Sequence, residues 1–175
     1  MLRSVSLVIA IALGLLITSP APAQEGVTPT QASAVEVPPP GQRDVCPVCG
    51  MFVAKYPEWV ATVVYSDGHA HFFDGAKDMF KFLHDVPKYG LPGHTAADIA
   101  IVAVTDYYDV RTIDAHDAFY VIGSDVYGPM GHELVPLASE ADADAFMKDH
   151  KGRRVLRFDE VTAQIPVNLD KGLFE

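Results

Sequence analysis

The chain has two cysteines, and they lie close together in the run Cys46-Pro47-Val48-Cys49-Gly50-Met51. Two thiols and a thioether therefore fall within a few residues of one another. Soft sulfur ligands favour soft metal ions, above all Cu(I). A further methionine, Met130, lies far along the chain between Pro129 and Gly131, where it serves neither a helical nor a strand face. This pattern indicates a protein that handles a soft metal.

The first residues have the pattern of a secretory signal peptide, which we place at 1–23. Arg3 gives a positive start, 5–17 is apolar, and Ala21-Pro22-Ala23 is the small-x-small pattern cut before Gln24. The apolar run is shorter than the ~20 residues that span a bilayer. No cysteine follows it to accept a lipid. We therefore expect an exported, periplasmic protein with no lipid anchor.

Composition divides the remaining chain into three parts. Residues 24–44 are rich in Pro, Ala and Gln, which predicts an extended and largely disordered spacer. Residues 45–165 have the length of one domain, and 166–175 form a C-terminal tail.

The formal net charge is -10, with no extended cluster of Lys and Arg. That charge argues against a nucleic acid or an anionic membrane as partner.

The first half of this domain, about 45–105, predicts a β-β-α-β unit. Residues 59–65 and 69–73 are expected to be strands joined by the hairpin turn Ser66-Asp67-Gly68, and 97–105 the strand after the helix. Asp74 is placed to cap the intervening helix. The helix is expected to bury Met79, Phe80, Phe82 and Leu83 and to expose Lys77, Lys81 and His84.

The second half, about 106–165, predicts the same order of elements. Residues 118–122, 133–137 and 154–158 are expected strands, and Ser139 caps a helix that runs to about His150 with Phe146 and Met147 on its buried face. Two weakly similar units of this kind predict one α+β domain of pseudo-twofold character. Cys46, Cys49 and Met51 of the first unit would then meet Met130 of the second at the interface, where ligand sites often form.

Several ordered motifs resemble the nitrous oxide reductase accessory (NosL) family of copper chaperones. They are Cys49-Gly50-Met51, Phe72-Phe73-Asp74, the stretch 118–124, Met130-Gly131 and Val135-Pro136. The resemblance spans 45–165 and implies tandem β-β-α-β halves similar to the organomercurial lyase fold. It also implies a non-enzymatic, exported Cu(I) carrier that takes copper from a donor and supplies it to nitrous oxide reductase.

Carried onto this sequence, the resemblance implies a particular set of metal ligands. Cys49 and Met51 come from the Cys-Gly-Met motif and Met130 from the Gly-flanked methionine of the second half. Cys46 adds a second thiol, and many members of the family are lipoproteins, whereas this chain lacks the acceptor cysteine. The histidines that could complete or extend the site are His132, His71, His69 and His116.

Two other functions and an enzymatic role compete with the copper chaperone. A thiol-disulfide oxidoreductase would use Cys46 and Cys49, but such a pair normally opens a helix, whereas a strand is expected here. A structural zinc site could combine these thiols with His69 and His71, but it would leave the methionines unused. An enzyme acting on a thiol-bound substrate is suggested only by analogy of fold, and no acid or base is evident.

Overall fold

The computed structural model describes residues 31–174, so the signal peptide expected at 1–23 lies outside the described residues. The strands are β1 (Ala61–Tyr65), β2 (Ala70–Phe73), β3 (Ile99–Thr105), β4 (Thr112–Asp114), β5 (Phe119–Ile122), β6 (Tyr127–Gly128), β7 (Gly131–His132), β8 (Val135–Leu137) and β9 (Arg154–Arg157). The α-helices are α1 (Ala76–His84), α2 (Val86–Tyr89), α3 (Glu140–Asp149) and α4 (Gln164–Leu169). Single 3-10 turns occupy Val53–Lys55, Pro57–Trp59, Ala96–Asp98 and Phe158–Glu160.

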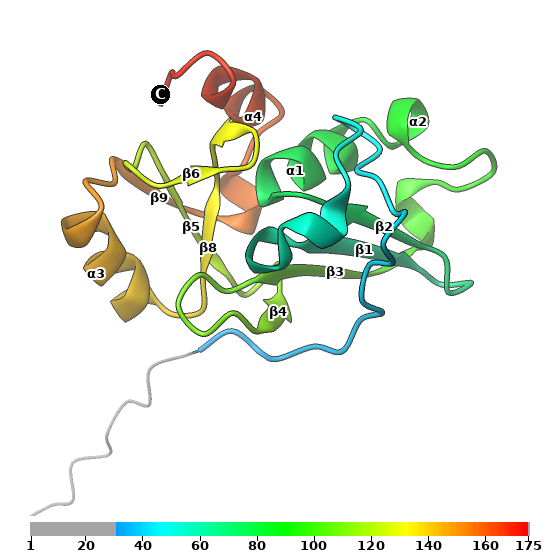
Figure 1. The fold of residues 1–175 in the computed structure, drawn as a ribbon, viewed down its shortest axis with the longest axis horizontal. Helices are drawn as coiled ribbons and strands as arrows, with labels where there is room; N and C mark the ends of the chain where they lie inside the picture. The colour runs from blue at the N-terminus through cyan, green and yellow to red at the C-terminus, as the bar shows by residue number, and fades with distance from the viewer. Residues whose placement is uncertain (1–30, 175) are drawn as a thin grey trace, which may run out of the picture.

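The strands form two antiparallel sheets, which lie side by side in Figure 1. The first sheet has the order β2-β1-β3-β4 and the second the order β8-β5-β9, while β6 and β7 pair as a separate hairpin. In the first sheet β1 lies between β2 and β3, and in the second sheet β5 lies between β8 and β9. The mixed helix and sheet fold predicted from the sequence is confirmed. The order β-β-α-β is present around α1, whereas in the second half β4, β6 and β7 are additional strands before α3. The pseudo-twofold relation between the halves stays a prediction.

The β1–β2 hairpin is built as its sequence requires. All five residues of β1 are buried, because the strand lies between β2 and β3. Its turn closes through Gly68, whose φ of 90° is strained for any residue with a side chain. The strand expected to begin at Trp59 begins at Ala61 instead, since Pro57 starts a 3-10 turn that ends at Trp59.

Helix α1 packs against β1, β2 and α4 and lies near the centre of the molecule (Figure 1). Met79, Phe80 and Phe82 are buried as expected. Two expectations about this helix were wrong. Asp74 does not cap it, because Gly75 is the N-cap residue. Lys77 is not on the solvent face, because the second half of the chain covers it.

Helix α3 covers the second sheet through its contacts with β5, β8 and β9. The cap predicted at Ser139 is confirmed, because its hydroxyl accepts a hydrogen bond from the amide of Asp142 at 3.1 Å. Phe146 is fully buried beside Val121 and Val135, and Met147 packs against the edge of that cluster. These contacts give the second half a small core of its own, next to the larger core around α1.

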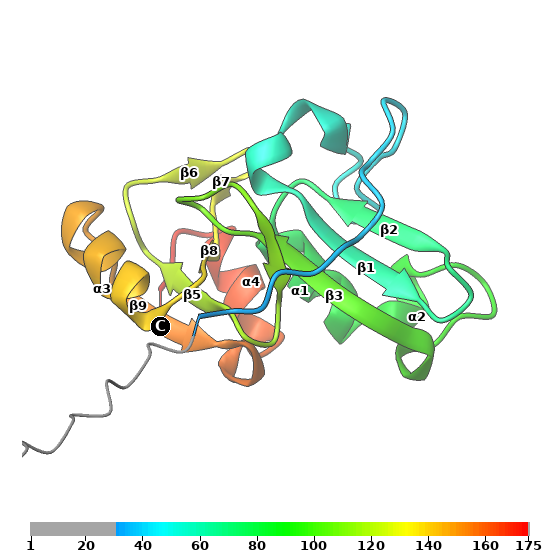
Figure 2. The same cartoon turned by 90° about the horizontal axis from the view of Figure 1, so that it is seen from below.

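The packed chain extends past both ends of the expected 45–165 domain. The amide of Ala32 donates to the carbonyl of Ala138 at 2.7 Å, and Ala34 forms an antiparallel bridge with Ile113 of β4. Part of the segment expected to be a spacer thus lies along the domain (Figure 2). At the other end, α4 buries Ile165 and Leu169 and so belongs to the core. No helix within 31–174 is long and apolar enough to cross a membrane.

Candidate metal centre

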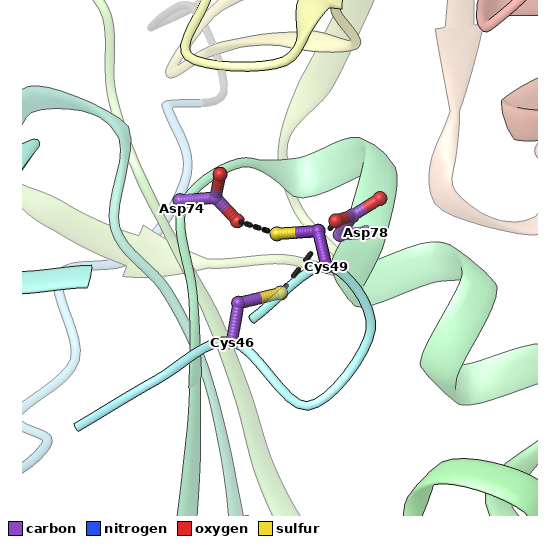
Figure 3. Close-up of side chains that lie close together, drawn as sticks. All are labelled: Cys46, Cys49, Asp74 and Asp78. Carbon is purple, nitrogen blue, oxygen red and sulfur yellow. Dashed lines mark hydrogen bonds between the residues drawn. The ribbon is translucent and has the colours of Figure 1, made fainter. Parts of the chain in front are cut away.

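The Cys46–Met51 segment folds into a tight loop that presents both thiols on one side (Figure 3). The amide of Cys46 donates to the carbonyl of Met51 at 2.9 Å, and the amide of Gly50 donates to the carbonyl of Cys46 at 2.8 Å. Gly50 has a φ of 78°, a left-handed conformation that favours glycine. The loop therefore places the sulfur atoms of the two cysteines within 4.8 Å of each other.

Two carboxylates, Asp74 just before α1 and Asp78 in its first turn, complete a cluster that we call the cysteine cluster: Cys46, Cys49, Asp74 and Asp78. The Cys49 thiol donates to Asp74 Oδ1 at 3.1 Å, and the Cys46 thiol donates to Asp78 Oδ2 at 3.5 Å (Figure 3). One ligand atom from each of the four residues lies within 4.8 Å of the others. Cys46 and both aspartates are buried, whereas Cys49 is half-buried. The cluster thus reaches the surface on the Cys49 side.

Both thiols are held in their protonated form. Burial raises the pKa of Cys46 to about 12, and the nearby Asp78 carboxylate adds to this effect. The pKa of Cys49 is also raised, first by burial and then by its hydrogen bond to Asp74. A thiol–disulfide exchange enzyme needs an accessible thiol of lowered pKa. Cys46 is buried, Cys49 is half-buried, and the pKa values of both thiols are raised, which argues against the thiol–disulfide oxidoreductase alternative.

The cysteine cluster suits a metal cation. Asp74 is 2% exposed, yet its Oδ2 atom has no hydrogen-bond partner within the described part of the chain. A buried oxygen left in this state costs free energy, which a cation in the cluster would recover. Asp78 is already paired with Lys81 Nζ at 2.9 Å, so part of the negative charge is compensated. Two thiols are the strongest soft-metal donors in the cluster.

The structure separates the predicted site residues into two groups. It brings Cys46 and Cys49 together, and Met51 closes their loop through its carbonyl. The two predicted histidines lie among aromatic rings: His71 between Tyr65 and Phe82, and His132 between Tyr127 and Phe174. Within 31–174, no histidine joins the cysteine cluster. The set needed for the zinc alternative, with His69 and His71, is therefore not gathered around the thiols.

Sequence reasoning did not identify Asp74 and Asp78 as members of the cluster. Asp74 follows Phe73 at the end of β2, where the sequence predicts a helix cap. Asp78 belongs to none of the motifs that indicate a metal ligand. The signal that could have found them is their position at the start of a helix whose preceding motif, Phe72-Phe73-Asp74, belongs to the family resemblance. Asp74 lies just before the N-cap residue Gly75 and Asp78 lies in the first turn of α1, so both carboxylates lie at the same end of the helix.

Met130 lies in the turn of the β6–β7 hairpin, and this turn is fastened to α1. Lys77 Nζ donates to the carbonyl of Met130 at 2.8 Å, although the two residues are 53 positions apart. Lys77 follows Asp74 and precedes Asp78 in the first turn of α1. Met130 is 46% exposed as a residue, so it does not fill the core. The second half therefore contacts the first turn of α1, which also carries Asp78 of the cysteine cluster, and a role of Met130 as a metal ligand stays a prediction.

Glu133 anchors the same hairpin from inside the protein. Its Oε1 atom accepts hydrogen bonds from the amide of Lys77 in α1 and, at 2.9 Å, from the amide of Leu134. The carboxylate lies against Gly75, where a side chain of any kind would overlap with it. Complete burial raises the pKa of Glu133 to about 8, against the opposing effect of the Lys77 charge. The contact at Gly75 explains why the N-cap residue of α1 is a glycine.

The raised pKa of Glu133 predicts how stability depends on pH. The folded protein keeps this proton up to about pH 8, whereas the unfolded chain releases it near the ordinary value of 4.5. The stabilising contribution of the protonated group is therefore complete below about pH 4.5 and lost as the pH rises towards 8. We expect the free energy of unfolding to fall over this window relative to that of Glu133→Gln. Urea denaturation of both proteins at pH 5 and pH 8 measures the difference, and parallel pH profiles would contradict it.

Comparisons with known proteins identify the family of this chain. The sequence model of the NosL family matches residues 38–166. The "Copper-binding lipoprotein NosL" of Stutzerimonas stutzeri is 32% identical over 118 residues, which are 67% of this chain and 62% of that protein. The present chain thus aligns with less than two thirds of the length of this curated relative.

A solved structure extends the similarity to the fold. The crystal structure of the copper chaperone NosL from Shewanella denitrificans is 27% identical and superimposes with a TM-score of 0.59. The superposition covers 78% of this chain and 99% of that one. These relatives are named for copper binding and for a chaperone role, which is not an enzymatic one. With the family match over most of its length and this agreement in fold, the chain belongs to the NosL family.

Proposed function

We propose that this protein is an exported metallochaperone that binds Cu(I) at the cysteine cluster and delivers it to a cuproenzyme, namely nitrous oxide reductase. The observation that carries the proposal is the convergence of the Cys46 and Cys49 thiols in a chain of this family. The names of the relatives support copper as the metal. Cu(I), rather than an oxidised ion, follows from the softness of thiol sulfur.

The proposed ligands are Cys49 and Cys46, with Met51 and Met130 as thioether donors. Met51 is half-buried in the same loop, and the backbone of Met130 is held beside α1 by Lys77. Either thioether can complete a Cu(I) site of low coordination number. His71 and His132 lie outside the cysteine cluster and would be at most auxiliary ligands.

Capture and release of copper follow from the chemistry of the thiols. The metal ligand is the thiolate, so copper must displace the thiol protons as it binds. Asp74 Oδ1 already accepts the hydrogen bond of Cys49 and is placed to receive its proton. Because Cys49 is the half-buried thiol, a ligand of the target enzyme would reach copper from that side. Stepwise replacement of ligands then transfers the ion without releasing it to solvent.

The location and partners of the protein are proposed on the same basis. The relative from Stutzerimonas stutzeri is named as a lipoprotein, which supports export. The first residues of this chain carry the signal-peptide pattern described above, which points to the periplasm. We therefore propose a periplasmic copper donor upstream and the apo form of nitrous oxide reductase downstream.

An anaerobic titration tests the proposed function. The reduced mature protein competes with a Cu(I) chelator of known affinity, and we expect about one Cu(I) per chain, bound far more tightly than Zn(II). The matched control is the double variant Cys46→Ser/Cys49→Ser, which keeps the size of both side chains and the two aspartates. Delivery is then measured as recovered activity of apo nitrous oxide reductase. Failure to take copper from a chelator of modest affinity would refute the proposal.

The Met130→Leu variant tests whether the second half contributes to the copper site. The change removes sulfur at nearly constant volume from a residue that is 46% exposed. Unfolding free energy should therefore change by less than ~1.5 kcal/mol, while Cu(I) affinity should fall by roughly tenfold. Met147→Leu, in a methionine packed on the second core, is the matched control and should leave affinity unchanged. A destabilised Met130→Leu protein with normal copper affinity would show that Met130 only packs.

A further inference from the structure

A second group of potential metal ligands lies at the tip of the β1–β2 hairpin. It consists of Asp67 in the turn, His69 just before β2, and His94 in the loop between α2 and β3, and we call it the hairpin triad. Asp67 Oδ2 lies 3.0 Å from His69 Nδ1 and 2.8 Å from His94 Nε2. Two imidazole nitrogens thus converge on one carboxylate oxygen. The hairpin triad shares no residue with the cysteine cluster.

Aromatic packing beneath the hairpin fixes one member of the hairpin triad. The His94 ring lies 4.3 Å from the buried ring of Tyr65, and the His69 ring lies 5.5 Å from that of His94. The His94 side chain is 17% exposed, while those of Asp67 and His69 are 49% and 63% exposed. One imidazole is therefore fixed by packing, and the other two groups are open to an ion arriving from solvent.

The spacing of the donor atoms suits a borderline divalent ion. Bonds of about 2.0–2.2 Å from Zn(II) to imidazole nitrogen and carboxylate oxygen, at a tetrahedral angle, separate the ligand atoms by about 3.4 Å. The two contacts to Asp67 Oδ2, at 3.0 and 2.8 Å, need to lengthen by only a few tenths of an ångström. The exposed side chains of Asp67 and His69 can make that movement. Three protein ligands leave a fourth position for water.

The chain contains a natural comparison for this arrangement. His116 donates its amide to Asp114 Oδ1 at 2.8 Å and places its ring Nδ1 3.0 Å from the same oxygen. His69 makes the same two contacts, from its amide and from its ring, with the carboxylate of Asp67, so an Asp-x-His pair by itself is a local turn feature. Only at Asp67 does a second imidazole arrive, from a residue 27 positions away. Tertiary structure therefore adds the ligand that local sequence does not supply.

We propose that Asp67, His69 and His94 form a second metal site, selective for a borderline divalent ion such as Zn(II) or Cu(II). Imidazole and carboxylate donors prefer these ions, whereas the thiols of the cysteine cluster prefer Cu(I). The two sites thus differ in the softness of their ligands and would bind different ions. Imidazole binds a metal ion in its neutral form.

A Zn(II) titration of the full mature protein, followed by NMR of the histidine side chains, tests the proposal. The spectra report which ring binds, so zinc held by the thiols is told apart from zinc at the hairpin triad. We expect the signals of His69 and His94 to shift together and to saturate at one Zn(II) in this site, while those of His116 stay in place. Equal and unsaturable shifts of His69 and His116, or no shift of His94, would overturn the proposal.

Matched variants separate a metal site from an ordinary turn. Asp67→Asn keeps the turn-forming side chain and lies on the exposed hairpin, so it should fold normally. Asp67→Asn and His94→Gln should each weaken Zn(II) binding at the hairpin triad by at least tenfold, whereas His116→Gln should change it by less than twofold. If His94→Gln does not fold, Asp67→Asn still decides the question. Unchanged affinity in Asp67→Asn, or an equal loss in His116→Gln, would contradict the site.

Discussion

The Cys49→Ser variant is expected to lose at least about a hundredfold in Cu(I) affinity, or roughly 2.7 kcal/mol. A serine hydroxyl keeps the volume and the hydrogen bond to Asp74 but is a poor ligand for a soft ion. Cys49 is also the half-buried member of the pair and lies in the Cys-Gly-Met motif. Its removal therefore affects both the binding of copper and the side from which copper is exchanged. The measurement is the anaerobic chelator competition used for the wild type.

The matched control is Cys46→Ser, which we expect to lose only about tenfold in Cu(I) affinity. Cys46 is fully buried, and its thiol makes the longer contact, 3.5 Å to Asp78. Both variants should unfold at similar denaturant concentrations, which separates lost ligation from lost folding. Equal losses of affinity in the two variants would indicate a symmetric dithiolate site instead. Unchanged Cu(I) affinity in Cys49→Ser would show that the cysteine cluster is not the copper site.

The Glu133→Ala variant is expected to lose about 3–5 kcal/mol of stability. The substitution leaves the buried amides of Lys77 and Leu134 without an acceptor and opens a cavity next to Gly75. Each unsatisfied buried donor costs about 1–3 kcal/mol, and the cavity adds to that cost. The β6–β7 hairpin would also lose its anchor on α1, so Cu(I) affinity should fall together with stability. Chemical denaturation and the chelator competition measure the two effects.

Glu133→Gln is the control for this prediction because its amide oxygen can still accept both backbone hydrogen bonds. At pH 5, where the wild-type carboxyl is protonated, the two proteins should differ by less than ~1.5 kcal/mol, as volume-conserving changes do. Copper affinity should be retained in Glu133→Gln. If alanine and glutamine are equally tolerated at position 133, the buried hydrogen bonds do not hold the hairpin. The Met130 turn would then have to be positioned by Lys77 alone.

Local structure was largely determined by the sequence itself. The β1–β2 hairpin follows from an apolar run that ends in a turn with glycine at a positive φ, and the cap of α3 follows from Ser139. The convergence of Cys46 and Cys49 is local as well, because they lie three positions apart in a loop that closes through the hydrogen bond from the Gly50 amide to the Cys46 carbonyl. Each of these features depends on interactions within a few residues, which periodicity and turn chemistry report directly.

The buried charges were decided only by the tertiary structure. Asp74 looked like a helix cap and Lys77 like a surface residue, because helical periodicity gives the direction of a side chain but not what packs over it. The Glu133 carboxylate, 56 positions from Lys77, accepts a hydrogen bond from the Lys77 amide in the first turn of α1. The Cys49 thiol, 25 positions from Asp74, donates a hydrogen bond to the Asp74 carboxylate. A charged group is buried only where a partner compensates its lost hydration, and that partner comes from a distant part of the chain. The ligand environment of the thiols therefore depends on how the two halves pack.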